Sequence, residues 1–247
     1  ASMADSNEEY GRKDYWDARF ADEEEFEWCR AYDDFAHLVR PHIEPWMRIL
    51  VVGCGNSRLS EQLCDDGFPN IRSMDYSHVA IKRMREKYGA SHPSMKWDEM
   101  DMLDMTYDDG SFDVVIEKGT LDVLWVDEKD YWNPTPLLKE NVHRFLGHVH
   151  RILTDTGVFL SITFGQPHFR RPLFGDLRYH WGLSVDRFGS GFDYFVYSLK
   201  RGGVIEPEVD TVVGQGVART EHEELDDESF IGRIGFHSDD SDAASDS

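Results

Sequence analysis

The feature that most constrains this chain is a glycine turn placed directly after a short apolar run. Residues 49–52, with the sequence Ile-Leu-Val-Val, lead into 53–57, Gly-Cys-Gly-Asn-Ser, and Leu59 and Leu63 then follow at helical spacing. Glycine lets the backbone approach a ligand at a point where a Cβ atom would obstruct it. A strand, a G-x-G turn and a helix in this order favour an α/β sheet with a ligand at the carboxyl end of the strand.

Apolar runs bounded by turn residues alternate with helical patterns along the chain. We predict seven strands: Ile49–Val52, Ile71–Tyr76, Met95–Met100, Phe112–Ile116, Val158–Phe164, Trp181–Phe188 and Phe192–Leu199. Strands that alternate with helices pair in parallel, whereas the short link 189–191 makes the last two strands an antiparallel hairpin. The sequence therefore predicts an α/β, Rossmann-like fold, with an open twisted sheet of seven strands, mostly parallel with an antiparallel C-terminal hairpin, and helices on both faces.

Charge is concentrated at the two ends of the chain. The 26 basic and 48 acidic side chains leave a formal charge of −22, of which residues 1–27 carry −7 and residues 204–247 carry −11. From residue 221 onward large apolar groups are too few to offset the entropy lost on ordering. We predict an acidic flexible N-terminus at 1–13, one domain at 14–203 and an acidic, largely disordered tail at 204–247. The tail either keeps the protein in solution or steers it toward a basic partner.

Composition also argues against several classes of protein. The chain has no apolar run long enough to span a membrane and no signal-peptide pattern, so we expect a cytoplasmic monomer without membrane association. Its three cysteines lack the even count and the C-x-x-C spacing of a disulfide framework or zinc site, and the histidines at 143, 148 and 150 do not converge on one metal. We therefore expect no metal. The net negative charge disfavours direct binding to nucleic acid.

Polar residues at the ends of the first three strands indicate the class of ligand. A dinucleotide turn needs a third glycine where this chain has Arg58, so pyrophosphate binding is disfavoured. Asp75 follows Gly53 by 22 residues, the spacing at which a carboxylate accepts hydrogen bonds from ribose hydroxyls. Asp101 and Met102 offer a carboxylate and an apolar face to a purine ring. Each carboxylate alone is equally consistent with a helix cap or loop charge, but the three strand ends together favour an adenosine site.

The fourth strand continues into a dense polar segment that we interpret as the site of chemistry. Its members are Glu117, Lys118, Gly119, Thr120, Leu121 and Asp122. A carboxylate at either end could orient an amine or accept its proton, and the lysine could bind a carboxylate. A loop held by salt bridges is the alternative. Cys54, inside the glycine turn, is more consistent with a small packing residue than with a nucleophile.

At these residues the sequence resembles a known family, the class I, seven-strand S-adenosylmethionine-dependent methyltransferases, and among them the lysine methyltransferases of translation elongation factor 1-alpha. The resemblance covers 14–203 and rests on Tyr-Trp-Asp at 15–17, on 49–57, on Met-Asp-Tyr-Ser at 74–77, on Met-Asp-Met at 100–102 and on 111–122 with its Glu-Lys-Gly-Thr-Leu-Asp. Pro-His-Phe at 167–169 and Gly-Ser-Gly-Phe at 189–192 look most like the branch encoded beside an endothelin-converting enzyme.

The resemblance implies a role for each matching residue. Trp16, Phe20 and Trp28 would form an N-terminal lid over the methyl donor, and Gly53 would lie beneath its methionine part. The ribose would be held by Asp75 and Tyr76, the adenine by Asp101 and Met102, and the methionine end by Lys118. The whole segment from Glu117 to Asp122 would be needed for activity. The family tends to have tyrosine where this chain has Phe20, so one hydroxyl contact is absent. Without the resemblance, Trp16 and Trp28 are equally consistent with helix packing.

Three functions follow from these observations. The first is a protein-lysine methyltransferase that transfers methyl from S-adenosylmethionine to a basic protein, elongation factor 1-alpha by resemblance, and releases S-adenosylhomocysteine. The second is a small-molecule methyltransferase with the same donor site, which a deep closed pocket would favour. The third is a binding module that has kept the fold without catalysis. The intact glycine turn and the segment 117–122 argue against the third.

Overall fold

The computed structural model describes residues 7–203, which contain a single seven-stranded sheet. The strands are β1 (Ile49–Val52), β2 (Ile71–Asp75), β3 (Lys96–Glu99), β4 (Phe112–Lys118), β5 (Leu153–Thr163), β6 (Trp181–Phe188) and β7 (Tyr194–Arg201). Their order across the sheet is β3-β2-β1-β4-β5-β7-β6. β1 to β5 pair in parallel, and β7 pairs antiparallel with both of its neighbours. The predicted fold class is therefore confirmed.

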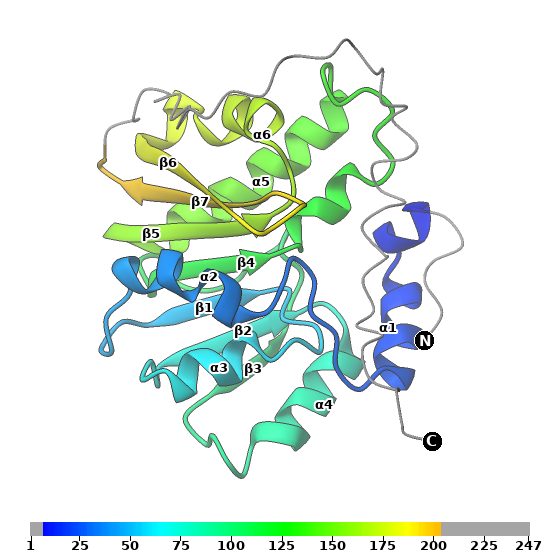
Figure 1. Cartoon of the computed structure of the whole chain (residues 1–247), viewed down its shortest axis with the longest axis vertical. Helices are drawn as coiled ribbons and strands as arrows, with labels where there is room; N and C mark the ends of the chain where they lie inside the picture. The colour runs from blue at the N-terminus through cyan, green and yellow to red at the C-terminus, as the bar shows by residue number, and fades with distance from the viewer. Residues whose placement is uncertain (1–6, 204–247) are drawn as a thin grey trace, which may run out of the picture.

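Helices cover both faces of this sheet (Figure 1). They are α1 (Lys13–Asp22), α2 (Tyr32–Val39), α3 (Leu59–Asp65), α4 (His78–Tyr88), α5 (Pro136–Ile152) and α6 (Pro167–Phe174), with short 3₁₀ helices η1 (Asn7–Gly11), η2 (Arg40–His42), η3 (Leu121–Trp125) and η4 (Leu177–Tyr179). α2, α3 and α4 share one apolar core with one face of the sheet, and α5, α6 and η3 share a second core with the other face.

The first strand shows why the sheet is buried on both sides. Ile49 and Val51 belong to one core and Leu50 and Val52 to the other, and none of the four is more than 1% exposed. Successive side chains of a strand point to opposite faces, so a strand with helices on both sides is apolar at every position. This explains the unbroken run of apolar residues that precedes the glycine turn.

All seven predicted strands are present, with differences at their ends. β4 continues past the predicted Ile116 to Lys118, so the first residues of the polar segment lie on the strand itself. β5 begins at Leu153 rather than Val158, because Leu153 pairs with Phe112 before a register shift. The intervening polar residues hide this early start from a hydropathy pattern. β7 begins at Tyr194, so the hairpin link is 189–193 rather than 189–191.

Two of the helices have side-chain caps. The hydroxyl of Ser77 accepts the backbone N–H of Ala80 at 3.2 Å at the start of α4. At the start of α5 the hydroxyl of Thr135 accepts the N–H of Leu138 at 3.3 Å. Such a bond satisfies one of the backbone donors that the first turn of a helix leaves unpaired.

The N-terminal segment lies at the edge of the sheet toward which the parallel strands point (Figure 1). The Ser77 hydroxyl donates to Asp17 of α1, and the guanidinium of Arg83 donates to the carbonyl of Phe20. These contacts attach α1 to α4. Within the segment that we expect to be flexible, 7–11 form η1, while residues 1–6 lie outside the described range, as does the predicted disordered tail.

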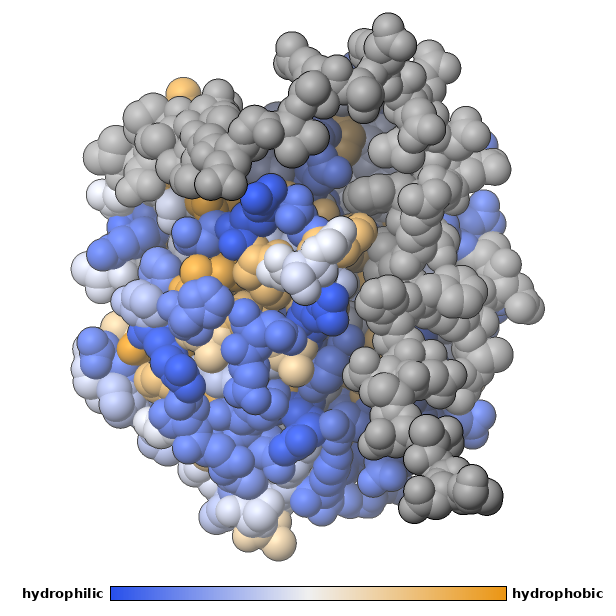
Figure 2. Space-filling view, in the orientation of Figure 1, coloured by the Kyte–Doolittle hydropathy of each residue, from blue (hydrophilic) through white to orange (hydrophobic). Residues whose placement is uncertain are grey.

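The visible face in Figure 2 is mostly hydrophilic, with hydrophobic residues gathered in small patches. Within residues 7–203, no helix is long and apolar enough to cross a membrane. The same part of the chain holds no group of three or more His, Cys, Asp or Glu side chains placed to bind a metal ion.

Candidate functional site

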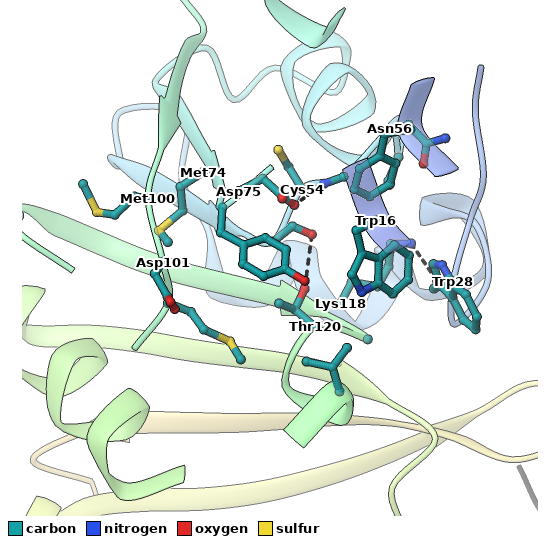
Figure 3. A pocket seen from close by; sticks show the side chains of 18 of the residues that line it. Trp16, Trp28, Cys54, Asn56, Met74, Asp75, Met100, Asp101, Lys118 and Thr120 are labelled. Carbon is teal, nitrogen blue, oxygen red and sulfur yellow. Dashed lines mark hydrogen bonds between the residues drawn. The ribbon is translucent and has the colours of Figure 1, made fainter. Parts of the chain in front are cut away.

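A pocket opens at the carboxyl ends of β1, β2 and β4 (Figure 3). β1 lies between β2 and β4 in the sheet, so this is where the strand order reverses. Open α/β sheets bind their ligands at such a switch point. Eleven of the predicted site residues line the pocket. They are Trp16, Phe20, Trp28, Gly53, Asp75, Tyr76, Asp101, Met102, Lys118, Gly119 and Thr120.

The glycine turn is held against the polar segment by Thr120. Its hydroxyl lies 3.1 Å from both the Val52 and the Gly53 carbonyl oxygens, to which it donates. Gly53 has a φ of +62°, and a Cβ there would lie 2.2 Å from the Thr120 side chain. No residue other than glycine fits this position, because both the backbone conformation and the space exclude a side chain. The turn after β1 and the segment after β4 therefore form one packed unit.

Asp75 ties the glycine turn to the end of β2. One of its carboxylate oxygens accepts the N–H of Gly55 at 2.9 Å and the other accepts the N–H of Ser77 at 2.8 Å. The side chain is buried, and burial raises the pKa of Asp75 to about 6, against the lowering effect of these two hydrogen bonds. Because an ionised carboxylate has about four acceptor positions, each oxygen keeps capacity to accept from a ligand in the pocket.

One wall of the pocket is apolar. Met74, Met100, Met102 and Leu103 line it, and Asp101 lies at its edge with one carboxylate oxygen accepting the N–H of Leu103 at 2.8 Å. Methionine side chains adapt to flat rings, which suits a purine. Asp101 is exposed and comes two residues after β3 ends, so the carboxylate is presented from a loop rather than from the strand itself.

An aromatic cluster from the N-terminal segment covers the opposite wall. The rings of Trp16 and Phe20 stack at 5.5 Å, and Trp28 meets Trp16 edge-on at 6.1 Å. The indole N–H of Trp16 donates to the Tyr10 carbonyl at 2.6 Å. Arg19 places its guanidinium 5.3 Å from the Trp28 ring. Offset and edge-to-face aromatic pairs and a cation over a ring are attractive arrangements, so the cluster is a preformed cover.

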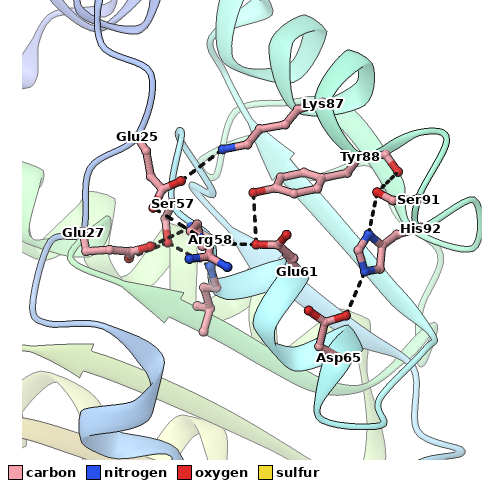
Figure 4. A network of polar contacts seen from close by, with 11 residues as sticks. Glu25, Glu27, Ser57, Arg58, Glu61, Asp65, Lys87, Tyr88, Ser91 and His92 are labelled. Carbon is pink, nitrogen blue, oxygen red and sulfur yellow. Dashed lines mark hydrogen bonds and ion pairs between the residues drawn. The ribbon is translucent and has the colours of Figure 1, made fainter.

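Lys118 is a buried cation with two oxygen partners from the same N-terminal segment. Its ammonium donates to the Glu27 carboxylate at 2.7 Å and to the Trp28 carbonyl at 2.6 Å. Glu27 in turn accepts the Ser57 hydroxyl at 2.8 Å and the N–H of Arg58 at 2.6 Å. Figure 4 shows how neighbouring Glu25, Lys87 and Glu61 extend this network over α3 and α4. The Glu27 carboxylate therefore bridges Lys118 and the start of α3.

Glu117, the residue before Lys118, points away from the pocket. One carboxylate oxygen accepts the N–H groups of Thr120 and Leu121, at 3.0 and 3.1 Å, and the other accepts the Ser161 hydroxyl of β5. The side chain is fully buried, and burial raises the pKa of Glu117 to about 7, with the charge of Asp122 as a second cause. Glu117 thus fixes the turn that carries Thr120.

Asp122 is the other carboxylate of the segment and is also buried. Its two oxygens lie 2.6 and 2.8 Å from the Thr163 hydroxyl, and it forms an ion pair with Arg170 of α6. The guanidinium of Arg170 lies 3.4 Å above the Trp125 ring. Gly165 leaves the room that Arg170 needs, since a Cβ there would lie 2.4 Å from its Nε atom. This cluster joins the polar segment to β5 and α6.

Cys54 is a packing residue of the glycine turn. The side chain is 4% exposed, and burial raises the pKa of the Cys54 thiol well above its ordinary value. A thiol acts as a nucleophile only as the thiolate. The structure therefore supports the packing interpretation.

The predicted site residues fall into two groups. Lys118, Gly119 and Thr120 line the pocket with the donor-site candidates, whereas Glu117, Leu121 and Asp122 do not and face the protein interior. Four side-chain partners of the segment were not predicted: Glu27, Ser161, Thr163 and Arg170. A carboxylate next to Trp28 and an arginine after Pro-His-Phe are the only local signals that could have drawn attention to them.

Comparison with known proteins defines the family. Residues 49–134 match the model of a methyltransferase domain. EEF1A lysine methyltransferase 4 of Mus musculus is 40% identical over 203 residues, which are 81% of this chain and 79% of the relative. The chain belongs to the eEF1A lysine methyltransferase family. It is an S-adenosylmethionine-dependent methyltransferase. The eEF1A lysine and N-terminal methyltransferase of Bos taurus is 37% identical over 199 residues, 79% of this chain and 28% of that longer protein.

Solved structures agree with the fold of this family. A SAM-dependent methyltransferase from Methanosarcina mazei superposes with a TM-score of 0.51 at 16% identity, covering 68% of this chain and 98% of the other. A SAM-dependent methyltransferase from Aquifex aeolicus gives 0.51 at 13% identity, covering 67% and 89%. At such low identity these methyltransferases establish the shared architecture of the sheet and helices.

Proposed function

We propose that this methyltransferase transfers methyl groups to a lysine of translation elongation factor 1-alpha. The observation that carries the proposal is the 40% identity to EEF1A lysine methyltransferase 4 over most of both chains. The Glu-Lys-Gly-Thr-Leu-Asp segment, which resembles that family, is held by buried hydrogen bonds at the rim of the pocket.

For the methyl donor we propose one position in the pocket. Asp75 and Tyr76 hold the ribose, because Asp75 keeps acceptor capacity on both oxygens beyond its two backbone bonds. Asp101 and Met102 hold the adenine against the apolar wall. The methionine part lies over Gly53 with its carboxylate on Lys118, and Trp16, Phe20 and Trp28 cover it.

The carboxylate of this donor meets one fixed positive charge. Lys118 offers its ammonium from the pocket wall, and Glu27, which does not line the pocket, holds that ammonium at 2.7 Å. Charge-assisted hydrogen bonds are about twice as strong as neutral ones. A fully formed network here would hold the donor's sulfonium end still, which is what an in-line displacement requires.

Bound S-adenosylmethionine supplies an electrophilic methyl group on a sulfonium, and the chain itself needs to supply position and a dry environment. A lysine with an ordinary pKa near 10.4 must lose its proton first, at a cost of about 4.6 kcal/mol at pH 7. Aromatic and apolar walls disfavour the charged amine, whereas a carboxylate beside it would favour the charge. The aromatic cover of Trp16 and Trp28 is therefore suited to this step.

Glu117 and Asp122 serve this reaction as positioning residues. Both are buried, both are engaged with groups of the protein, and neither lines the pocket. They act on the reaction by fixing Lys118, Gly119 and Thr120 in the pocket wall. A substrate proton is then released to solvent rather than to either carboxylate.

The test is methyl transfer from labelled S-adenosylmethionine to purified elongation factor 1-alpha, run beside a cell extract. We expect label on a lysine of the factor, located by peptide mass spectrometry. Trp46→Ala, which changes an exposed residue that does not line the pocket, should keep the activity, and Lys118→Met should lose most of it. Label on another protein would keep the enzyme class and replace the substrate. Label on small molecules of the extract alone would make this a small-molecule methyltransferase.

A further inference from the structure

The loop between η3 and α5 exposes an aromatic surface that the donor pocket does not use. Trp132 is 73% exposed, and its ring stacks on His168 of α6 at 5.0 Å with the planes 17° apart. Phe169 meets Trp132 edge-on at 5.2 Å and lies 5.7 Å from the Tyr131 ring. We call Tyr131, Trp132, His168 and Phe169 the aromatic shelf. None of the four lines the donor pocket.

The backbone that carries Trp132 is ordered by acidic side chains of its own loop. One carboxylate oxygen of Asp130 accepts the N–H groups of Trp132 and Asn133 at 2.9 and 3.1 Å, and the other accepts the Asn133 side-chain amide at 3.1 Å. Glu128 accepts the N–H of Thr135 at 2.8 Å. The bonds from Asn133 and Trp132 lower the pKa of Asp130. A large ring held in place before binding loses little further entropy when a partner covers it.

The shelf is connected to the wall of the donor pocket. Val123 and Leu124 of η3 line that pocket, and the loop starts directly after η3. On the other side, Arg170 follows Phe169 in α6 and pairs with Asp122, two residues after Thr120. η3 therefore lines the pocket and leads into the loop of the shelf, while α6 carries the rest of the shelf and pairs with Asp122 of η3. A protein that inserts a side chain into the pocket has the shelf within the area it covers.

The charge of the loop that carries Trp132 favours a basic occupant. Residues 126–135 contain three acids, Asp127, Glu128 and Asp130, and one base, Lys129, in a chain with a formal charge of −22. Of the two arginines that follow Phe169 on α6, Arg170 is buried and paired with Asp122. A guanidinium or ammonium is attracted to the face of a tryptophan ring, and a planar guanidinium also stacks on it. Tryptophan is enriched among the residues that contribute most to binding near the centre of protein interfaces.

We propose that the aromatic shelf docks a basic segment of the protein substrate, with an arginine or lysine side chain placed over Trp132. The proposal rests on the proposed function, since it requires a protein as methyl acceptor. The segment contacted is distinct from the lysine that is methylated. Docking at the shelf then sets the affinity for the protein substrate, while the pocket sets the affinity for the methyl donor.

The test compares two exposed tryptophans in steady-state methyl transfer to elongation factor 1-alpha. Trp132→Ala should raise KM for the protein roughly tenfold to thirtyfold, with kcat within about twofold, because a hot-spot contact is lost without a change in the pocket. Trp46→Ala is the matched control, since Trp46 is 66% exposed and lies before β1, outside the shelf. Its KM should equal that of the wild type.

Two further measurements keep the outcome interpretable. The affinity of each variant for S-adenosylhomocysteine, by calorimetry, should match the wild type, which shows that the fold and the pocket are intact. Asp127→Asn should raise KM by a smaller factor, and mainly at low salt, because its effect on a basic partner is electrostatic.

The possible results separate the two proposals. If the wild type labels the factor and Trp132→Ala has the same KM as Trp46→Ala, the docking proposal is wrong and the proposed function stands. If the wild type labels a different protein, the same comparison is made on that protein, and equal KM values again overturn the docking proposal. If the wild type labels no protein, both proposals fail.

Discussion

The segment from Glu117 to Asp122 has two sides that differ in what they contact. Lys118, Gly119 and Thr120 line the pocket, whereas Glu117 and Asp122 face the interior and contact β5 and α6. Charged groups occur on both sides, so the two sides differ in what their side chains contact rather than in whether they are charged. A run of six consecutive residues can therefore combine residues that line a pocket with residues that hold them in place.

We expect substitutions on the two sides to have different effects. Changes on the interior side should lower stability and, through it, activity. Changes on the pocket side should weaken donor binding in a protein that remains folded. Four substitutions test this division, beginning with the largest expected effect.

Asp122→Ala leaves Arg170 without its anion in a site where both side chains are at most 7% exposed. Removing one partner of a buried pair costs about 3–5 kcal/mol. We expect a loss of this size in the free energy of unfolding, measured with urea, together with loss of activity. Asp122→Asn keeps an acceptor for Thr163 and should lose less. A fully stable but inactive Asp122→Ala protein would place Asp122 with the pocket side.

Glu117→Gln should change the pH dependence of stability. The carboxyl has an ordinary pKa of 4.5 and a pKa of about 7 in the folded protein. Between these values the folded state holds a proton that the unfolded chain has released, so stability falls as the pH rises. The shift corresponds to about 3 kcal/mol.

The measurement is the free energy of unfolding of the wild type minus that of the Gln variant. This difference should decrease between pH 4.5 and 7 and level off above pH 7. Taking the difference removes the opposing contribution of paired carboxylates such as Asp113, whose pKa is lowered by Arg48. A difference that is flat across the interval would show that Glu117 is ionised in the folded protein throughout.

Lys118→Met should weaken donor binding with little loss of stability. The substitution removes a charged hydrogen bond worth about 1.5–3 kcal/mol, so the dissociation constant for S-adenosylhomocysteine should rise roughly tenfold to a hundredfold. Glu27 keeps Ser57 and the N–H of Arg58 as partners, which limits the effect on folding. Calorimetric titration and a thermal melt measure the two quantities. A large drop in melting temperature would show that Lys118 mainly stabilises the fold, as we expect of the interior side.

Thr120→Val is the smallest change, because valine keeps the shape and removes only the hydroxyl. Two carbonyl oxygens of the glycine turn, each 3.1 Å away, lose their donor. We expect a loss of about 1 kcal/mol, seen as a donor affinity lowered about fivefold. Thr120→Ser, which keeps the hydroxyl, should bind the donor as the wild type does. If Val and Ser variants bind equally, the contact between turn and segment is steric alone.

The fold was largely predictable because its signals are local. The apolar run of β1, the glycine turn and the helical spacing of Leu59 and Leu63 each involve residues close together in the chain. The end of β5 nearest α5 escaped prediction because a polar stretch there still pairs with β4. Its pairing depends on a partner strand and not on its own hydropathy.

The two sides of the segment could not be told apart from sequence. Glu117 and Lys118 are neighbours on a strand, so they point to opposite faces, but nothing local says which face is open. That depends on Arg170, 48 residues beyond Asp122, and on Glu27, 91 residues before Lys118. Contacts at such separations are made by the folded sheet and leave no pattern in the surrounding residues.

The reactivity of Cys54 offers a way to follow the opening of the glycine turn. Its thiol is buried in the glycine turn, while Cys64 on α3 is partly exposed. A thiol reagent will modify Cys64 in the native state, whereas Cys29 and Cys54, which are 5% and 4% exposed, will react only when the structure around them opens. The rate at which Cys54 is labelled, followed by peptide mass spectrometry so that Cys29 is counted separately, therefore reports how often the glycine turn opens toward the pocket that it lines. A methyl donor that keeps the turn closed will slow the labelling of Cys54. The lower rate then reports donor binding without any methyl transfer.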